Sequence, residues 1–164
     1  MAEKTLVIIK PDAVYRGFSG KIINRFEEVG FSIAAMKFQK VSEKQAVEHY
    51  KEHEGRDYYK RLMNFLLSGP VIVMVLEGPD VITRIRKMTG KTIATERESG
   101  TVRGDYSVNN LYNLIHSSDS SESSAREISI FFKPEEILEY ETATKKYWFF
   151  WVLFYTQVVE KLLI

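Results

Sequence analysis

The chain has 164 residues, of which 45% are hydrophobic and 27% are charged, and its formal net charge is +1. These values are typical of one soluble globular domain with a real core, and they argue against the broad basic surface with which many proteins bind nucleic acid. The absence of cysteine excludes disulfides, zinc thiolate sites and thiol catalysis. No repeat, linker or apolar leader segment is evident, so we expect one cytoplasmic domain followed by a C-terminal tail.

The first part of the chain alternates between strand and helix patterns. The β-branched apolar run 5–9 predicts a strand that is buried on both faces. Apolar residues at helical spacing predict a helix over 19–29, with Ser19 as its N-cap and Gly30 just beyond its end. Residues 31–41 alternate loosely between apolar and polar side chains, which predicts a second strand.

The middle of the chain contains two helix patterns before a third strand. Residues 42–45 form a capping-box pattern, which predicts a helix that continues through Tyr50. A second helix, capped by Asp57, is expected to precede a buried strand over 71–76. Another helix is expected over 80–88, with Asp80 as its cap and a glycine just beyond its end.

The last third of the chain combines a long loop with two short apolar runs. Residues 91–110 show little apolar periodicity, and a long loop inside a compact domain is usually functional. The apolar run 111–115 is typical of a buried strand that stops at a sheet edge, where His116 and the polar residues after it begin. A short helix is expected from Ser120 to about Glu127, followed by a fourth sheet strand over 128–132.

This order of elements predicts an α+β fold. Pro134 is expected to open one more short helix near the end of the domain. Four strands and the helices between them suit a ferredoxin-like sandwich, in which helices pack on one face of a four-stranded antiparallel sheet. The same architecture hosts enzymes, RNA-binding modules and metal carriers, so the fold alone does not identify the function.

The three histidines are the first candidates for a functional site. His116 would lie where apolar packing ends, and an imidazole with a pKa near neutrality can act there as a nucleophile or a base. Its position alone favours a core histidine whose ring nitrogens are hydrogen-bonded by neighbouring residues. His49 and His53 are four residues apart and could bind a metal, but the sequence shows no third ligand, so we expect both to be exposed.

The residues around His116 resemble the active-site signature of nucleoside diphosphate kinases, Asn-x-x-His-Gly/Ala-Ser-Asp. In this chain the signature consists of Asn113, His116, Ser117, Ser118 and Asp119. Ser117 stands where the family usually has Gly or Ala. The resemblance extends from about residue 5 to residue 140 and includes three further motifs in the family's order, at 9–12, 68–70 and 100–105.

The resemblance implies the ferredoxin-like fold and an enzyme that transfers the γ-phosphate of a nucleoside triphosphate, typically ATP, to a nucleoside diphosphate. The implied route has two steps, with phosphohistidine at His116 as the intermediate. It also implies that Glu127 holds the ring in one tautomer and that Ser118 assists. Lys10 and Tyr50 are implied to take part in catalysis. Nucleotide contacts are implied for Lys10, Tyr58, Arg86, Thr92, Arg103 and Asn113.

Two kinds of implied contact, to phosphate and to the base, have a clear physical basis. Arg86 and Arg103 would offer the planar fork that suits phosphate oxygens. Tyr58 stands where the family usually has a Phe that stacks on the base, and stacking accepts any base because it contacts a π surface. We expect no metal site built by the protein alone, since Mg²⁺ would be held mainly by nucleotide phosphates and water.

Two other functions remain open from the sequence. The resemblance favours an active enzyme. The alternative is a catalytically silent homologue that binds nucleotides or partners as a scaffold, and the matched site residues argue against it. A nucleic-acid-binding module is disfavoured by the near-zero net charge. The resemblance also implies a homo-oligomer, commonly a hexamer built from dimers.

We divide the chain into a catalytic domain over 1–140 and a hydrophobic tail over 141–164. Seven of the nine residues in 147–155 are aromatic, and a segment so apolar needs a surface that covers it. The apolar run is far shorter than the ~20 residues that a membrane span requires. We expect the tail to dock on its own domain or on a neighbouring subunit, with a membrane surface as the alternative.

Overall fold

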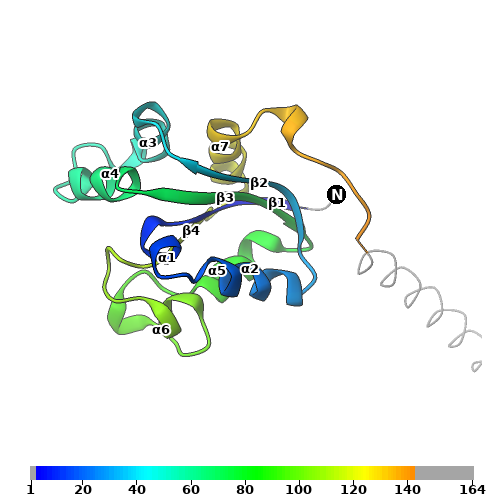
Figure 1. The fold of residues 1–164 in the computed structure, drawn as a ribbon, viewed down its shortest axis with the longest axis horizontal. Helices are drawn as coiled ribbons and strands as arrows, with labels where there is room; N and C mark the ends of the chain where they lie inside the picture. The colour runs from blue at the N-terminus through cyan, green and yellow to red at the C-terminus, as the bar shows by residue number, and fades with distance from the viewer. Residues whose placement is uncertain (1–2, 143–164) are drawn as a thin grey trace, which may run out of the picture.

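The computed structural model describes residues 3–142, and the aromatic tail predicted over 147–155 lies outside that range (Figure 1). Four strands form one sheet in the order β2-β3-β1-β4, and all neighbouring strands are antiparallel. The strands are β1 (Glu3–Ile9), β2 (Ser32–Lys40), β3 (Pro70–Gly78) and β4 (Ile115–Ser117). This sheet with its packed helices confirms the predicted α+β, ferredoxin-like fold.

Helices cover both faces of the sheet, so the expectation that they lie on one face is wrong (Figure 1). The central strands β1 and β3 are therefore buried on both sides, as their continuous apolar runs indicate. One face carries α3 (Glu43–His49), α4 (Tyr59–Leu67) and α7 (Ser121–Phe131). The other carries α1 (Pro11–Tyr15), α2 (Ser19–Glu28), α5 (Val81–Thr89) and α6 (Val102–Tyr106). Three short 3₁₀ turns complete the described chain: η1 (Lys51–His53), η2 (Ala94–Glu96) and η3 (Pro134–Glu136).

The fourth strand of the sheet is β4, and the strand predicted over 128–132 is wrong. Residues 128–131 instead continue α7, whose first turn is capped by the Ser120 hydroxyl accepting from the backbone N–H of Ser123. The run is short and rich in β-branched residues, which resembles a strand when it is seen alone. Burial of Ser124, Glu127 and Phe131 follows helical spacing, so packing on the sheet determines the structure here.

The predicted helices exist, but several predicted caps do not. The capping box at Ser42 is present, with its hydroxyl accepting from the N–H of Gln45 and its own N–H bonded to the Gln45 side chain. Ser19 is instead the first residue of α2, and Asp57 does not cap α4, whose N-cap is Tyr58. Asp80 occupies the N-cap position of α5 without a capping hydrogen bond from its side chain.

The long loop over 91–110 contains η2 and α6 and is held together by polar contacts. Arg97 donates from Nη2 to the carbonyl oxygens of Thr92 at 2.7 Å and Asn109 at 2.9 Å, which ties the two ends of the loop to each other. An ion pair joins the loop to α2: Arg25 of that helix lies 2.6 Å from the carboxylate of Asp105 in the loop. These side chains order a segment that has no apolar periodicity of its own, and they fix its position against α2.

Candidate active site

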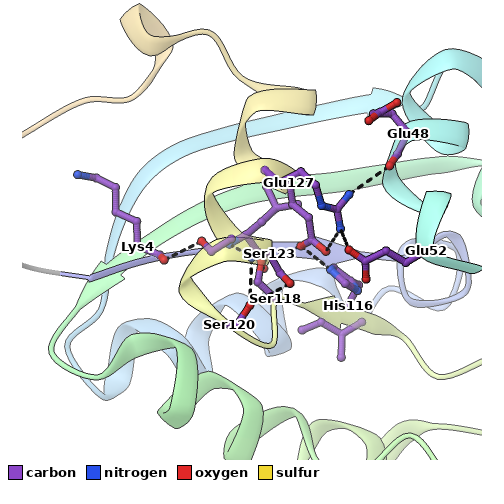
Figure 2. Close-up of polar contacts among 12 residues, drawn as sticks. Lys4, Glu48, Glu52, His116, Ser118, Ser120, Ser123 and Glu127 are labelled. Atoms are coloured by element: carbon purple, nitrogen blue, oxygen red, sulfur yellow. Dashed lines mark hydrogen bonds and ion pairs between the residues drawn. The ribbon is translucent and has the colours of Figure 1, made fainter.

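His116 is the middle residue of β4, and its imidazole is oriented by a carboxylate from α7. The His116 Nε2 lies 2.8 Å from Oε2 of Glu127. The Ser118 hydroxyl donates to the same carboxylate oxygen at 2.7 Å (Figure 2). Glu127 is 4% exposed, so these contacts are shielded from water. A carboxylate at this distance favours the tautomer with the proton on Nε2, which leaves the lone pair on Nδ1.

Arg126 contacts the other oxygen of the Glu127 carboxylate. Its guanidinium lies 3.8 Å from Oε1 of Glu127 and 3.0 Å from the Glu52 carboxylate. It also donates to the backbone carbonyl of Glu48 at 3.2 Å (Figure 2). The arginine thereby joins α7 to the end of α3 and to η1, and it fixes the helix face from which Glu127 reaches His116.

The backbone just before β4 is strained. Leu114 has a φ of 69°, in the left-handed region that costs a residue of this kind roughly 1–3 kcal/mol. Two contacts hold it there: its N–H donates to Asp12 at 3.1 Å, and its carbonyl accepts from the backbone of Lys10 at 2.8 Å. Burial raises the pKa of Asp12, an effect that the hydrogen bond from Leu114 opposes. The turn at Leu114 interrupts the extended backbone, so the strand predicted over 111–115 is wrong. The strand β4 begins at Ile115 and continues through His116 to Ser117.

Two buried cations lie beside this turn. Lys10 donates from Nζ to the Asn113 side-chain oxygen at 2.8 Å, and burial together with the charge of Arg103 lowers the pKa of Lys10 to about 7. Arg103 donates to the carbonyls of Gly90 at 2.7 Å and Ile115 at 2.6 Å. Burial, with smaller effects from Arg97 and Arg86, lowers the pKa of Arg103 to about 10. An anion placed between such cations would stabilise their charged forms.

These side chains border a cleft of about 910 Å³. Most of the residues singled out in the sequence line it: Lys10, Tyr50, Tyr58, Thr92, Arg103, Asn113 and His116. An adjoining cavity of about 220 Å³ is lined by Arg86 and Glu127, and it shares His116 and Arg103 with the cleft. Ser118 lies behind the carboxylate, with its hydroxyl near both backbone groups of Leu6. The structure thus brings the predicted residues together around one imidazole.

The expectation that the other two histidines are exposed is wrong for His49. It is 4% exposed, and its ring packs edge-on against His116 with 4.5 Å between ring centres. Burial and the neighbouring His116 lower the pKa of His49, so the ring is neutral. His49 shares the buried side of its helix with Ala46 and is followed by buried Tyr50. That helical spacing was the signal in the sequence that indicated burial.

Other lining residues carried no clear signal in the sequence. His53 lies 3.3 Å from the Tyr58 hydroxyl and thereby fixes one wall of the cleft. Tyr112 packs against Phe65 with 5.1 Å between ring centres, and Asn110 accepts from the backbone of Ala94 at 2.8 Å. The remaining wall is formed by Arg61, Leu62, Ala94, Val108, Asn109, Asn110, Leu111 and Tyr112. No helix within residues 3–142 is long and apolar enough to cross a membrane.

Fold and site together define a class of protein. A histidine held by a buried carboxylate, facing a cleft with buried cations and aromatic walls, is suited to moving phosphoryl groups between nucleotides. The protein is a phosphotransferase on a ferredoxin-like fold.

Comparison with known proteins identifies the family. The model of the nucleoside diphosphate kinase family matches residues 3–137. The chain is 52% identical over 139 residues to a nucleoside diphosphate kinase of Methanocaldococcus jannaschii, covering 85% of this chain and 99% of that relative. It is 48% identical over 151 residues to the Pyrococcus furiosus enzyme, covering 90% and 92%. The structure of a Halobacterium salinarum nucleoside diphosphate kinase in complex with CDP aligns with a TM-score of 0.86 at 38% identity, covering 90% of this chain and 98% of that chain.

The chain therefore belongs to the nucleoside diphosphate kinase family. It transfers the terminal phosphate of a nucleoside triphosphate to a nucleoside diphosphate, which confirms the reaction predicted from the sequence.

Proposed function

We propose that the transfer proceeds through a phosphohistidine at His116, in two steps at one site. The lone pair on Nδ1 attacks the γ-phosphorus in line, the bond to the β-γ bridging oxygen breaks, and the nucleoside diphosphate leaves. A second diphosphate then binds in its place and takes the phosphoryl group from the ring. The observation that carries this proposal is the 2.8 Å contact between Nε2 of His116 and Glu127. Because that contact favours a proton on Nε2, the lone pair on Nδ1 is available to bond to phosphorus.

Glu127 would act by charge as well as by orientation. When Nδ1 bonds to phosphorus, the ring becomes cationic, and the carboxylate on Nε2 stabilises that charge. The Ser118 hydroxyl and Arg126 keep the carboxylate in place from its two other sides. Ser117 is 6% exposed and lines the adjoining cavity, where a small side chain leaves room for the phosphoryl group.

The cations would bind the triphosphate and neutralise charge as it moves. Lys10 and Arg103 already lie on the cleft wall, Thr92 lines both the cleft and the adjoining cavity, and Arg86 lines the adjoining cavity. Burial raises the pKa of Tyr50, so its hydroxyl remains a hydrogen-bond donor at neutral pH. Asn113 positions Lys10 through its 2.8 Å contact.

The aromatic wall would bind the base. Tyr58 is 38% exposed and lines the cleft, and its hydroxyl is 3.3 Å from His53. A base stacked on this ring would contact a π surface whatever its hydrogen-bonding edge, which suits an enzyme that accepts many nucleosides.

Magnesium would enter with the nucleotide. The carboxylate of Asp119 lines the adjoining cavity, whereas Glu127 is engaged by His116 and Ser118. The Asp119 carboxylate, which also accepts a hydrogen bond from the Ser123 side chain, would join phosphate oxygens and water in the octahedral oxygen shell that Mg²⁺ prefers. The bound ion supplies charge neutralisation on the phosphates.

Initial-rate kinetics test the two-step route. Varying donor and acceptor nucleotides together should give parallel double-reciprocal lines, because the first diphosphate leaves before the second binds. Intersecting lines would show that both nucleotides bind at once and that no phosphorylated enzyme is needed.

Glu127→Gln tests the orienting carboxylate. We expect phosphorylation of His116 to slow by about 10–100-fold, because the amide keeps a polar contact to the ring but cannot stabilise its positive charge. Single-turnover labelling with a γ-labelled triphosphate measures this step. Glu136→Gln is the matched control, since its carboxylate pairs with Lys37 on the opposite edge of the sheet. A labelling rate equal to that of the unchanged protein would remove Glu127 from the mechanism.

We expect Lys10 to take up a proton when a nucleotide binds. Its pKa is about 7 in the free protein, and a bound polyphosphate raises that pKa by favouring the charged form. Above that pH the lysine must be protonated on binding, so affinity should fall as pH rises, by at most about tenfold per unit. Calorimetry of diphosphate binding in two buffers of different ionisation enthalpy, between about pH 7.5 and 9, isolates this proton because the phosphate is already ionised. Equal proton uptake in Lys10→Met would contradict the assignment.

We propose a cytoplasmic homo-oligomer, with a hexamer as the favoured assembly. The β2 edge of the sheet supports association. Leu138 bonds to the Ala34 carbonyl at the start of this edge, but Met36 and Phe38 further along are 48% and 68% exposed, and an exposed edge strand readily pairs. The catalytic domain over 1–140 would assemble, and the tail over 141–164 would dock on it or on a neighbouring subunit.

Deleting residues 147–164 tests the role assigned to the tail. We expect the shortened protein to keep its nucleotide exchange but to melt at a lower temperature or to change its oligomeric state. Light scattering and thermal melting measure both. Unchanged assembly and melting, together with flotation of the full chain on anionic liposomes, would instead favour a membrane surface.

A further inference from the structure

Three potential metal ligands converge behind the catalytic cleft. One ring nitrogen of His49, one of His116 and one carboxylate oxygen of Glu127 lie within 4.8 Å of one another. They come from α3, β4 and α7, so the fold brings together groups that are far apart in the sequence. The third ligand that the sequence did not show for His49 is therefore supplied by the catalytic pair, and His53 is not a member of the group.

His49 has no other evident use for its buried nitrogen. The ring is 4% exposed, and its Nδ1 has no hydrogen-bond partner in the described part of the chain. The ring also lines the 220 Å³ cavity together with His116 and Glu127. Buried polar atoms are nearly always bonded, so an unpartnered nitrogen in a histidine that lines a cavity indicates a ligand position.

We propose that these three residues bind one transition-metal ion of the Zn²⁺ type and that this binding stops nucleotide exchange. Two imidazoles and one carboxylate suit zinc, whereas Mg²⁺ prefers an all-oxygen shell. Three protein ligands leave a fourth position open, and the cavity has room for a water there. Tetrahedral bonds of about 2.1 Å place ligand atoms roughly 3.4 Å apart, so small side-chain rotations would close the present spacing.

Inhibition follows from the use of His116. Exchange needs both of its ring nitrogens, since Nε2 contacts Glu127 and Nδ1 is assigned to the phosphoryl group. A metal on either nitrogen removes one of these functions. The charges around the cavity are mixed, because Asp119 and Glu52 offset the arginines that also line it. The ion would thus compete with phosphorylation at the nucleophile itself.

Titration of the full-length, untagged protein with ZnCl₂ in the absence of nucleotide tests the site. We expect one ion per chain. His49→Phe keeps a ring between Tyr50 and Phe131 but removes the nitrogen, and it should weaken zinc binding at least about 100-fold, since even outer-shell changes cost about 10–100-fold. His53→Phe is the matched control, because His53 is the one other histidine of the chain, and it should keep the affinity of the unchanged protein.

Two further measurements keep the test decisive. Co²⁺ bound to the unchanged protein should show the intense visible absorption of tetrahedral coordination. The ratio of exchange rates with and without Zn²⁺ should be small in the unchanged protein and close to one in His49→Phe. No bound zinc, no tetrahedral cobalt spectrum or equal zinc affinity in His49→Phe would overturn the proposal. Because zinc binding is measured without nucleotide, its failure is separate from a failure of the phosphohistidine route.

Discussion

His116→Ala is expected to abolish phosphoryl exchange, with kcat/KM falling by on the order of 10⁴-fold or more, because the covalent route loses its carrier. Nucleotide affinity should stay within a few-fold of that of the unchanged protein. The phosphate-binding cations depend on other contacts, such as the Lys10–Asn113 pair and the two carbonyls that hold Arg103. Coupled-assay kinetics and calorimetric diphosphate binding measure the two quantities separately.

The matched control for that experiment is His53→Ala, which removes an imidazole from the same cleft without removing the nucleophile. It should retain phosphohistidine formation, although base binding is expected to weaken because His53 holds Tyr58. Substantial exchange by His116→Ala would show that phosphate passes directly between nucleotides or through another residue.

Arg103→Lys is expected to lower kcat/KM by about 100-fold, the cost typical of removing one preorganised donor to a transferring group. The arginine lines the cleft and donates to two backbone carbonyls, while its buried Nε has no partner in the described part of the chain. A lysine is a point charge and cannot fill these positions together. Steady-state kinetics with ATP as the donor measure the loss.

Arg84→Lys provides the comparison, since Arg84 also donates to two carbonyls, those of Pro79 and Val29, but outside the cleft. Its kcat/KM should be unchanged. Thermal melting of both variants separates lost carbonyl contacts from lost catalysis. A kcat/KM for Arg103→Lys close to that of the unchanged protein would mean that Arg103 serves the fold alone.

The strands and helices were predictable where burial and periodicity agree. The run at 5–9 forms a central strand because both of its faces are covered, and the Ser42 capping box forms as its local chemistry dictates. The segment 128–132 was not, because a short β-branched run carries the same local signal in a strand and in a buried helix. Only its packing on the sheet, which long-range contacts decide, distinguishes the two.

Some features of the candidate site were likewise predictable from the sequence, and others were not. Motif resemblance singled out Lys10, Arg103 and His116, whose side chains the structure gathers at one cleft. The strained turn at Leu114 had no signature, since the contacts that hold it come from Asp12 and Lys10, about a hundred positions earlier. The prediction that His49 is exposed was wrong because it rested on the four-residue spacing to His53. The three-residue spacing between Ala46 and His49 is the pattern that indicates a buried helix face.

The most direct test of the phosphohistidine route is to identify the phosphorylated atom. After brief incubation with a γ-labelled nucleoside triphosphate, the protein should carry one acid-labile, alkali-stable phosphoryl group per chain, on Nδ1 of His116. Peptide mapping locates the residue, and ³¹P NMR of the phosphorylated protein distinguishes the two ring nitrogens. Label on Nε2, on another histidine or on a serine, or exchange without any labelled protein, would contradict the proposed route.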